Sequence, residues 1–194
     1  MTTTLLWLRQ DLRLADQPAL QAAIERGGSI IPVFIWSPEE EGEWQHGAAS
    51  RWWLHQSLGK LSAAIEKRGS KLILRRATDS LACLRELLAE TGATAVYWGR
   101  RYEPLIIARD ARIKNELRES GIEARSFNTA LLIEPWDVQN LSGKPFQVFT
   151  PFWRKACTAI DPPKPAAAPT RIAAPATWPR TTTIEDLGLM PRIG

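Results

Sequence analysis

The chain has 194 residues, 44% of them hydrophobic and 24% charged, and its formal net charge is +4. This composition excludes an acidic disordered chain, a collagen-like chain and a disulfide-rich scaffold, and it fits one domain with an additional segment. The small positive charge permits contact with nucleic acid but does not argue for it. Half of the 14 prolines lie between residues 161 and 194, so the additional segment is expected there.

Short apolar runs alternate with segments of helical periodicity through the first 128 residues. A short apolar run between turn residues indicates a buried strand, and apolar residues at steps of three and four indicate a helix. In chain order, these patterns predict strands at residues 5–8, 30–36, 72–74, 95–98 and 122–127, with helices at residues 18–26, 50–68, 80–90 and 104–119 between them. The acidic run Glu39–Glu43 is expected to form a solvated loop.

This alternation predicts an α/β fold: a Rossmann-like, doubly wound five-stranded parallel sheet with helices on both faces. Residues 1–128 would form this domain. Five strands in a segment of this length suit an open sheet rather than an eight-stranded barrel, which takes roughly 250 residues. Residues 129–160 are expected to form an irregular extension with a short helix at 151–160. Residues 161–194 have the Pro/Ala-rich composition of an interdomain linker, extended rather than packed.

Ligands of open α/β sheets bind outside the carboxyl ends of the strands. Cationic and aromatic side chains follow three of the predicted strands, and the helix that begins near residue 50 would add others at the same edge. These candidates are Arg9, Asp11, Arg13, Trp36, Ser37, Arg51, Trp52 and the segment Gly99–Glu103. Guanidinium and aromatic faces can stack on a conjugated ring, and guanidiniums can pair with a phosphate or carboxylate. The set therefore predicts a site for a flat, anionic, conjugated ligand.

A structural interpretation stands beside this one, because Arg9, Asp11, Arg13 and Asp16 could simply form a surface ion-pair network. No GxGxxG motif or P-loop follows the first strand, which disfavours an ordinary dinucleotide or Walker-type site. His55 is expected to have a surface or packing role.

The cysteines and the apolar runs bear on the compartment. Cys83 and Cys157 have no metal-type spacing and are expected to be free thiols in a reducing cytoplasm, with no metal site. No apolar run reaches the roughly 20 residues that a membrane span needs.

Four segments resemble signatures of the DNA photolyase/cryptochrome family, in the order in which the family has them. They are Trp7–Asp16 (WLRQDLRLAD), Gly47–Leu54 (GAASRWWL), Val96–Pro104 (VYWGRRYEP) and Gly143–Trp153 (GKPFQVFTPFW). Leu187–Pro191 also resembles the segment that leads into the second domain of that family. The third signature usually carries Asn where this chain has Gly99.

The resemblance implies a function. Members join this α/β domain to a larger helical domain that holds FAD, flips a pyrimidine dimer out of DNA and splits it by light-driven electron transfer. The α/β domain often holds a second, light-harvesting chromophore: a folate, a deazaflavin or a flavin. The chain is therefore expected to be the antenna domain of a deoxyribodipyrimidine photolyase, closest to those that repair cyclobutane pyrimidine dimers. By itself it would not be catalytic.

The same resemblance implies partners and a compartment. FAD, and contact with DNA, would belong to the helical domain, which this chain does not contain. The protein is expected to be a cytoplasmic monomer that has this FAD domain as its partner and makes no membrane contact.

The resemblance also implies which chromophore and which residues to expect. Folate-binding members have a polar Asn-Glu pair where this chain has Leu105 and Ile106, and an apolar pair cannot hydrogen-bond to a pterin edge. A deazaflavin or flavin is therefore expected rather than a folate. Arg51 and Arg109 match positions near the antenna in deazaflavin-type members. Trp36 and Arg101 complete the set of candidate chromophore-binding residues.

Two other functions remain open at this stage. The first is the corresponding domain of a cryptochrome, a blue-light receptor rather than an enzyme. The second is a stand-alone nucleotide-binding α/β module, against which the proline-rich segment argues. The nine tryptophans do not decide between these functions, because most are expected to be packing residues.

Overall fold

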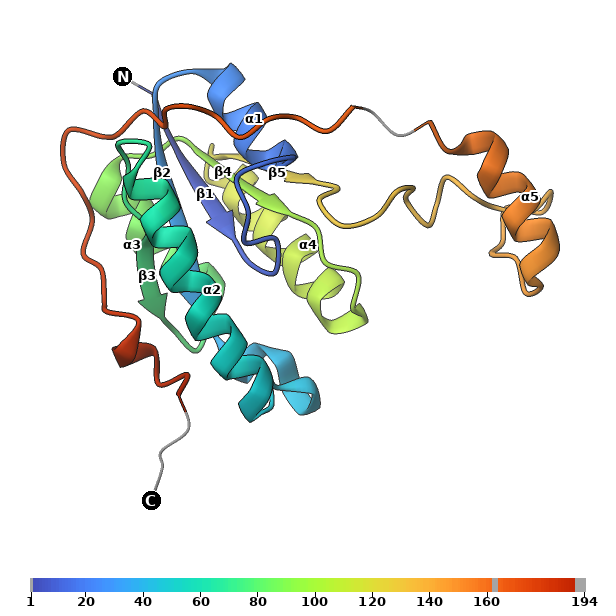
Figure 1. The fold of residues 1–194 in the computed structure, drawn as a ribbon, viewed down its shortest axis with the longest axis horizontal. Coiled ribbons are helices and arrows are strands. Elements are labelled where there is room, and N and C mark those ends of the chain that lie inside the picture. The colour runs from blue at the N-terminus through green and yellow to red at the C-terminus, as the bar shows by residue number, and fades with distance from the viewer. Residues whose placement is uncertain (1, 162–163, 191–194) are drawn as a thin grey trace.

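The sheet of the computed structural model, which describes residues 2–161 and 164–190, has five parallel strands in the order β3-β2-β1-β4-β5 (Figure 1). The strands are β1 (Thr3–Leu8), β2 (Ser29–Trp36), β3 (Ile73–Arg76), β4 (Ala95–Gly99) and β5 (Glu123–Phe127). The central strand β1 pairs with β2 on one side and with β4 on the other, so the strand order reverses at β1. The predicted doubly wound parallel sheet is confirmed.

Four helices cover the two faces of this sheet. They are α1 (Pro18–Arg26), α2 (Ala48–Glu66), α3 (Ser80–Thr91) and α4 (Pro104–Glu119). Leu20 of α1 and Leu58 of α2 belong to one core cluster, and Leu84 of α3 and Ile113 of α4 belong to the other. Because successive strand residues point to opposite faces, the continuous apolar strands supply both clusters.

Local chemistry sets the helix ends. Asp79 caps α3, because its carboxylate accepts a hydrogen bond from the Ala82 N–H at 2.9 Å. Gly92 ends the same helix in the left-handed conformation, with φ of 62°.

The acidic run after β2 is not the solvated loop that the sequence suggests. Residues Pro38–Trp44 form two short 3₁₀ turns, together called η1, with a kink at Gly42 where φ is 56°. Glu40 and Glu41 turn toward the body of the domain, where their carboxylates pair with Arg109 and Arg101. Composition alone could not reveal this, because the two arginines lie 69 and 60 residues further along the chain.

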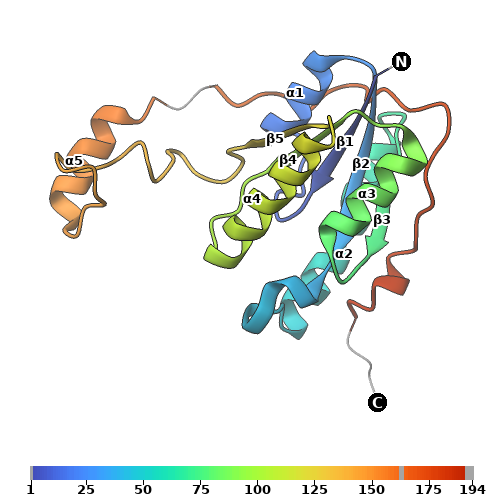
Figure 2. The same ribbon diagram turned by 180° about the vertical axis from the view of Figure 1, so that it is seen from behind.

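The chain leaves the sheet after β5. Glu134 holds the first part of this extension against the domain, since it pairs with Arg100 and accepts a hydrogen bond from the Tyr102 hydroxyl at 2.8 Å. The chain then runs outward to α5 (Phe149–Ala159), which lies apart from the sheet in both views (Figures 1 and 2). The short helix predicted at 151–160 is thus present and begins two residues earlier.

Residues 164–190, called the strap below, run back along the domain and are packed, which corrects the expectation of an unpacked linker. Ile172, Leu187 and Leu189 of the strap are buried in the same core cluster as α1 and α2. A short 3₁₀ helix, η2, spans Glu185–Leu187. The strap is extended, so its few apolar residues reach the core singly and leave no periodic pattern in the sequence.

The strap also covers the outer edge of the sheet. The Leu74 N–H of β3 donates to the Thr181 hydroxyl at 2.9 Å, and the Thr182 N–H donates to the Leu74 carbonyl at 3.0 Å. An uncovered edge strand presents unpaired backbone groups to other chains. These two contacts satisfy part of that edge within the same molecule.

The two cysteines are expected to differ in reactivity. Cys83 is 5% exposed in the core, whereas Cys157 is exposed on α5. Burial raises the pKa of Cys83 to about 11, so its thiol stays protonated at pH 8. At that pH, iodoacetamide should alkylate one thiol per folded chain and two per chain unfolded in guanidinium, as counted by intact mass. Equal alkylation of both thiols in the folded chain would contradict the burial of Cys83.

Candidate functional site

A cleft of about 700 Å³ lies at the carboxyl ends of β1 and β2. The strand ends form its floor and the first two turns of α2 form one wall. Its larger lining residues are Trp7, Phe34, Trp36, Trp53, Leu54, Arg9, Arg13, Arg101 and Arg109, and its neutral polar lining residues include Gln10, His46, Ser50 and Ser57. The cleft thus lies where the strand order reverses, the position at which open α/β sheets bind ligands.

Three of the four predicted chromophore-binding residues, Trp36, Arg101 and Arg109, line this cleft, and Arg51 does not. The residues that α2 contributes are Ala49, Ser50, Trp53, Leu54 and Ser57, which recur at helical spacing on one face. Arg51 lies off that face. Its buried Nε makes no hydrogen bond within the described part of the chain.

Arg101 is held by carboxylates. Its guanidinium donates to Glu41 through two nitrogens, at 2.5 and 2.7 Å, and to Glu103 at 2.7 Å. Burial alone would lower the pKa of Arg101, but the hydrogen bonds and charges of these two carboxylates outweigh it and raise the pKa above its usual value. Arg101 is therefore a fixed cation whose charge is already balanced.

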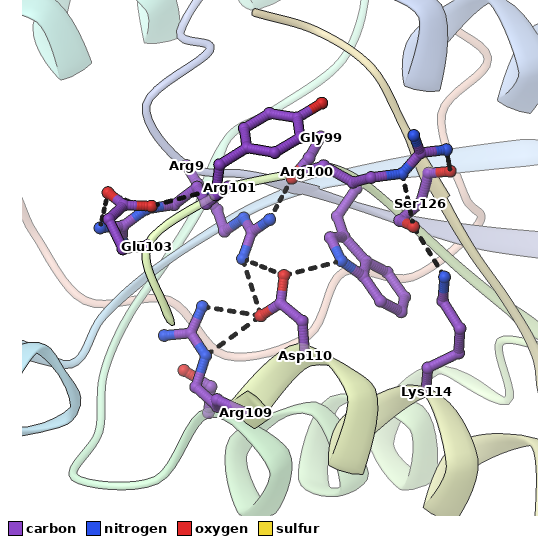
Figure 3. Close-up of polar contacts among 12 residues, drawn as sticks. Arg9, Gly99, Arg100, Arg101, Glu103, Arg109, Asp110, Lys114 and Ser126 are labelled. Carbon is purple, nitrogen blue, oxygen red and sulfur yellow. Dashed lines mark hydrogen bonds and ion pairs between the residues drawn. The ribbon is translucent and has the colours of Figure 1, made fainter. Parts of the chain in front are cut away.

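Arg9 and Arg109 share the carboxylate of Asp110 (Figure 3). Arg9 Nη1 lies 2.8 Å from one oxygen of Asp110 and 3.0 Å from the other, and Arg109 Nη2 lies 3.0 Å from Oδ1. Arg109 also reaches Glu40 at 3.2 Å. Both guanidiniums lie over the ring of Trp7, at 4.8 and 5.3 Å from its centroid. Burial lowers the pKa of Arg9, and Asp110 opposes that shift.

This pairing changes the electrostatic character of the cleft. Arg9, Arg101 and Arg109 each contact a carboxylate, so a ligand phosphate would have to compete with Asp110, Glu40 or Glu41. The anionic part of the expected ligand therefore loses its main support. What the cleft offers is aromatic walls, a few neutral polar groups and Arg13, whose guanidinium contacts only backbone carbonyls among the described residues. Aromatic walls with few polar groups are the usual lining of a site for a flat organic ligand.

The surface ion-pair network considered for Arg9, Asp11, Arg13 and Asp16 is also not what forms. Within the described residues no ion pair joins these four. Asp11 accepts a hydrogen bond from the side chain of Gln17 at 2.8 Å, and Arg13 donates to the carbonyls of Asp16 and Thr129, at 2.8 and 2.7 Å. Their role is to hold the turn after β1 in place at one end of the cleft.

Gly99, the departure from the third family signature, has a steric reason. A Cβ at this position would collide with the carboxylate of Asp11 and the hydroxyl of Thr129. The carbonyl of Gly99 also accepts a hydrogen bond from Arg9. Asp11 and Thr129 thus occupy the space that the side chain of a larger residue would need.

A second cleft of about 590 Å³ adjoins the first and shares Gln10, His46, Ser50 and Arg101 with it. Leu105 and Ile106 line this second cleft together with the exposed indole of Trp44. The sequence interpretation did not include Trp7, Phe34, His46 and Trp53 as lining residues. The helical stripe Ala49–Ser57 was the available signal for Trp53, whereas His46 has no signal in the sequence.

Within residues 2–161 and 164–190, no group of three His, Cys, Asp or Glu side chains could hold a metal ion. No described helix is both long and apolar enough to cross a membrane. The fold and the cleft define the class: an open, doubly wound α/β domain with an aromatic-walled cleft at the reversal of strand order.

Comparison with known proteins gives the family. The DNA photolyase family model matches residues 4–170, so the chain belongs to the DNA photolyase family. It is 43% identical over 187 residues to the deoxyribodipyrimidine photo-lyase of Agrobacterium fabrum, covering 96% of this chain and 38% of that protein. It is also 43% identical over 170 residues to cryptochrome-1 of Arabidopsis thaliana, covering 87% of this chain and 25% of that protein.

Solved structures agree with this assignment. A class III photolyase from Agrobacterium tumefaciens superposes with a TM-score of 0.90 at 41% identity, covering 100% of this chain and 39% of that one. An archaeal photolyase from Sulfolobus tokodaii, solved with two FAD molecules, shares the fold, with a TM-score of 0.75 at 21% identity, covering 96% of this chain and 41% of that one. The chain spans about two fifths or less of these relatives and corresponds to their N-terminal domain.

Proposed function

We propose that this chain is the light-harvesting antenna domain of a deoxyribodipyrimidine photolyase, and that the first cleft holds the antenna chromophore. The observation that carries the proposal is the aromatic-walled cleft of about 700 Å³ at the reversal of strand order. Its volume lies within the roughly 300–1,000 Å³ of ordinary ligand sites. The archaeal relative with two FAD molecules supports the idea that a photolyase can hold a second flavin-sized group.

The residues of the cleft fit a flat conjugated ring. Trp36 and Trp53 offer aromatic faces, and the buried Nε1–H of Trp7 has no hydrogen-bond partner within the described residues. A ring carbonyl would be a suitable acceptor for such a donor. A chromophore bound here would absorb light. The protein would hold its ring against the aromatic side chains of the cleft and exclude water from the covered surface.

A flavin or deazaflavin fits better than a folate. Leu105 and Ile106 line the adjoining second cleft, and neither side chain could donate a hydrogen bond to, or accept one from, a pterin edge that extended into it from the first cleft. In the proposed site Trp36, Arg101 and Arg109 surround the ring, with the two arginines fixed by their carboxylates. Arg51 would act from outside the cleft, through the packing of α2.

The activity of the whole protein is proposed on the same basis. FAD binding, DNA binding and dimer cleavage would belong to a second domain like the one that makes up the larger part of the relatives, and this chain alone would not be catalytic. We propose a cytoplasmic monomer. A cryptochrome domain is the alternative, because the identity to a photolyase and to a cryptochrome is 43% in both cases. Light-dependent cleavage of pyrimidine dimers by a chain that includes the second domain would distinguish the two.

Binding of added chromophores tests the cleft directly. Riboflavin, FMN and a reduced folate should be titrated separately into the purified chain and followed by fluorescence, and we expect a flavin to bind more tightly than the folate. If neither flavin nor folate binds, and the purified chain carries no near-UV or blue absorption band, the antenna proposal fails.

Exposed tryptophans provide a matched pair of variants for this titration. Trp53 lines the first cleft and is 68% exposed, whereas Trp44 lines only the second cleft and is 81% exposed. An aromatic contact contributes about 1 kcal/mol, so Trp53→Ala should weaken flavin binding about fivefold. Trp44→Ala should change the dissociation constant less than twofold. The reverse order would put the ligand in the second cleft.

A further inference from the structure

Residues 139–160, called the excursion below, lead away from the sheet and its helices (Figures 1 and 2). The excursion begins after Val138, which is 4% exposed, and includes α5. Both views show α5 separated from the sheet and its helices, with extended chain on either side (Figures 1 and 2). An 11-residue helix is marginal by itself in water, so its stability depends on what packs against it.

One side of α5 is apolar and open. Phe149 and Trp153 are 70% and 51% exposed, and Val148, which precedes the helix, is 63% exposed. The rings of Phe149 and Trp153 are one helical turn apart and stack at 6.0 Å with an interplanar angle of 11°. These two rings and the exposed side chain of Val148 are called the α5 face below. Surfaces of this kind mark sites of association.

The other side of α5 has contacts within the excursion. Ala156 is 1% exposed, and the rings of Phe146 and Phe152 lie 6.4 Å apart. The turn before α5 is fixed by Asn140, whose side chain accepts hydrogen bonds from the backbone N–H groups of Ser142 and Lys144. The excursion therefore has a defined shape of its own. The α5 face, with Phe149 and Trp153, takes no part in these contacts and stays exposed.

The charge of the excursion indicates what kind of surface fits the α5 face. Residues 139–160 contain Lys144, Arg154 and Lys155 and no acidic residue. A second copy of this chain would bring an equal positive charge to the contact, which disfavours a homodimer. A partner with an apolar centre and an acidic rim would be complementary.

The longer solved relative indicates where such a partner would come from. The Agrobacterium tumefaciens structure matches 100% of this chain, excursion included, while this match covers only 39% of that longer chain. We propose that the α5 face is the docking surface for the second, FAD-binding domain, which would meet it with an apolar patch rimmed by carboxylates. This inference rests on the proposed function, because it takes that domain as the partner.

A chimera tests the docking. This chain would be followed by the part of the Agrobacterium fabrum relative that it does not match. The variant with Phe149→Ser and Trp153→Ser is compared with a control carrying Trp44→Ser and Leu105→Ser, two exposed apolar residues on the main domain. We expect the α5 variant to be cleaved between the domains by protease at least tenfold faster than the parent chimera. The control should match the parent, and high salt should increase the parent's cleavage rate.

The isolated chain provides a second measurement that does not depend on the chimera. If the α5 face is open, the dye ANS should bind the parent chain and bind the Phe149/Trp153 variant at least fivefold less, with the same melting temperature. Equal cleavage of both chimeras, or unchanged ANS binding, would overturn the proposal. A dimer of the isolated chain, or a duplex DNA complex, that the α5 substitutions abolish would replace it with another partner. None of these readouts depends on a chromophore in the cleft, so the antenna proposal can fail separately.

Discussion

Replacing Asp110 with alanine is expected to lower the free energy of unfolding by about 3–5 kcal/mol, the cost of removing one partner of a buried ion pair. Arg9, which is 7% exposed, would lose both of its carboxylate contacts, and Arg109 would lose one of its two carboxylate partners. The indole N–H of Trp98 donates to the same carboxylate at 3.3 Å and would lose its acceptor. The two guanidiniums would then lie against Trp7 without the Asp110 carboxylate that balances their positive charges.

Urea unfolding followed by tryptophan fluorescence measures this effect. Arg112→Ala is a matched control on the same helix, because Arg112 pairs with Asp79 but both side chains are more than 40% exposed. Exposed pairs contribute about 0–1 kcal/mol, so this variant should unfold near the parent midpoint. If Asp110→Ala and Arg112→Ala unfold together, the Arg9–Asp110–Arg109 network does not support the cleft.

Ile172→Ala is expected to cost about 2–5 kcal/mol, the usual cost of truncating a buried aliphatic side chain to alanine. Ile172 is 0% exposed, although it lies in a segment with linker composition. Its N–H donates to the carbonyl of Arg68 at 2.9 Å, and the next residue accepts a hydrogen bond from the Ile30 N–H at 2.8 Å. The truncation would leave a cavity between the strap and the face of α1 and α2.

Thr177→Ala is the control, because Thr177 lies at an exposed position of the same strap. It shows whether any substitution in the strap lowers stability or only one that removes a buried side chain. It should change the free energy of unfolding by less than about 0.5 kcal/mol. A strap that behaves as a free linker would give the two variants the same stability in urea.

The sheet and its helices could be predicted because the sequence pattern of each element lies within that element. Ile30–Trp36 is apolar throughout, and the stripe of α2 repeats every three or four residues, so both patterns survive without knowledge of the fold. The strap could not be predicted in the same way. Its buried residues, Ile172 and Leu187, are single contacts separated by 15 positions.

The sequence predicts where the cleft lies, but it does not predict how the charges of its arginines are paired. Strand ends converge at one edge of a parallel sheet, which is why Trp36 and Arg101 were identified. The charge balance was missed, because Glu40 meets Arg109 across 69 positions and Glu41 meets Arg101 across 60. A cluster of arginines in the sequence indicates an anion-binding site when the positions of the carboxylates are not known. Only the three-dimensional fold shows that Arg9, Arg101 and Arg109 already pair with carboxylates.

The strap has a consequence for how the protein is made. The strands and helices emerge from the ribosome first, but the core cluster of α1 and α2 is completed only by Ile172, Leu187 and Leu189. Chains fold from the N-terminal side during synthesis at about 5–20 residues per second. The nascent domain therefore keeps an incomplete core cluster and an open β3 edge until the strap has left the ribosome. During that interval, a chaperone that recognises extended apolar segments would bind the emerging strap, with Ile172 and Leu187 not yet buried.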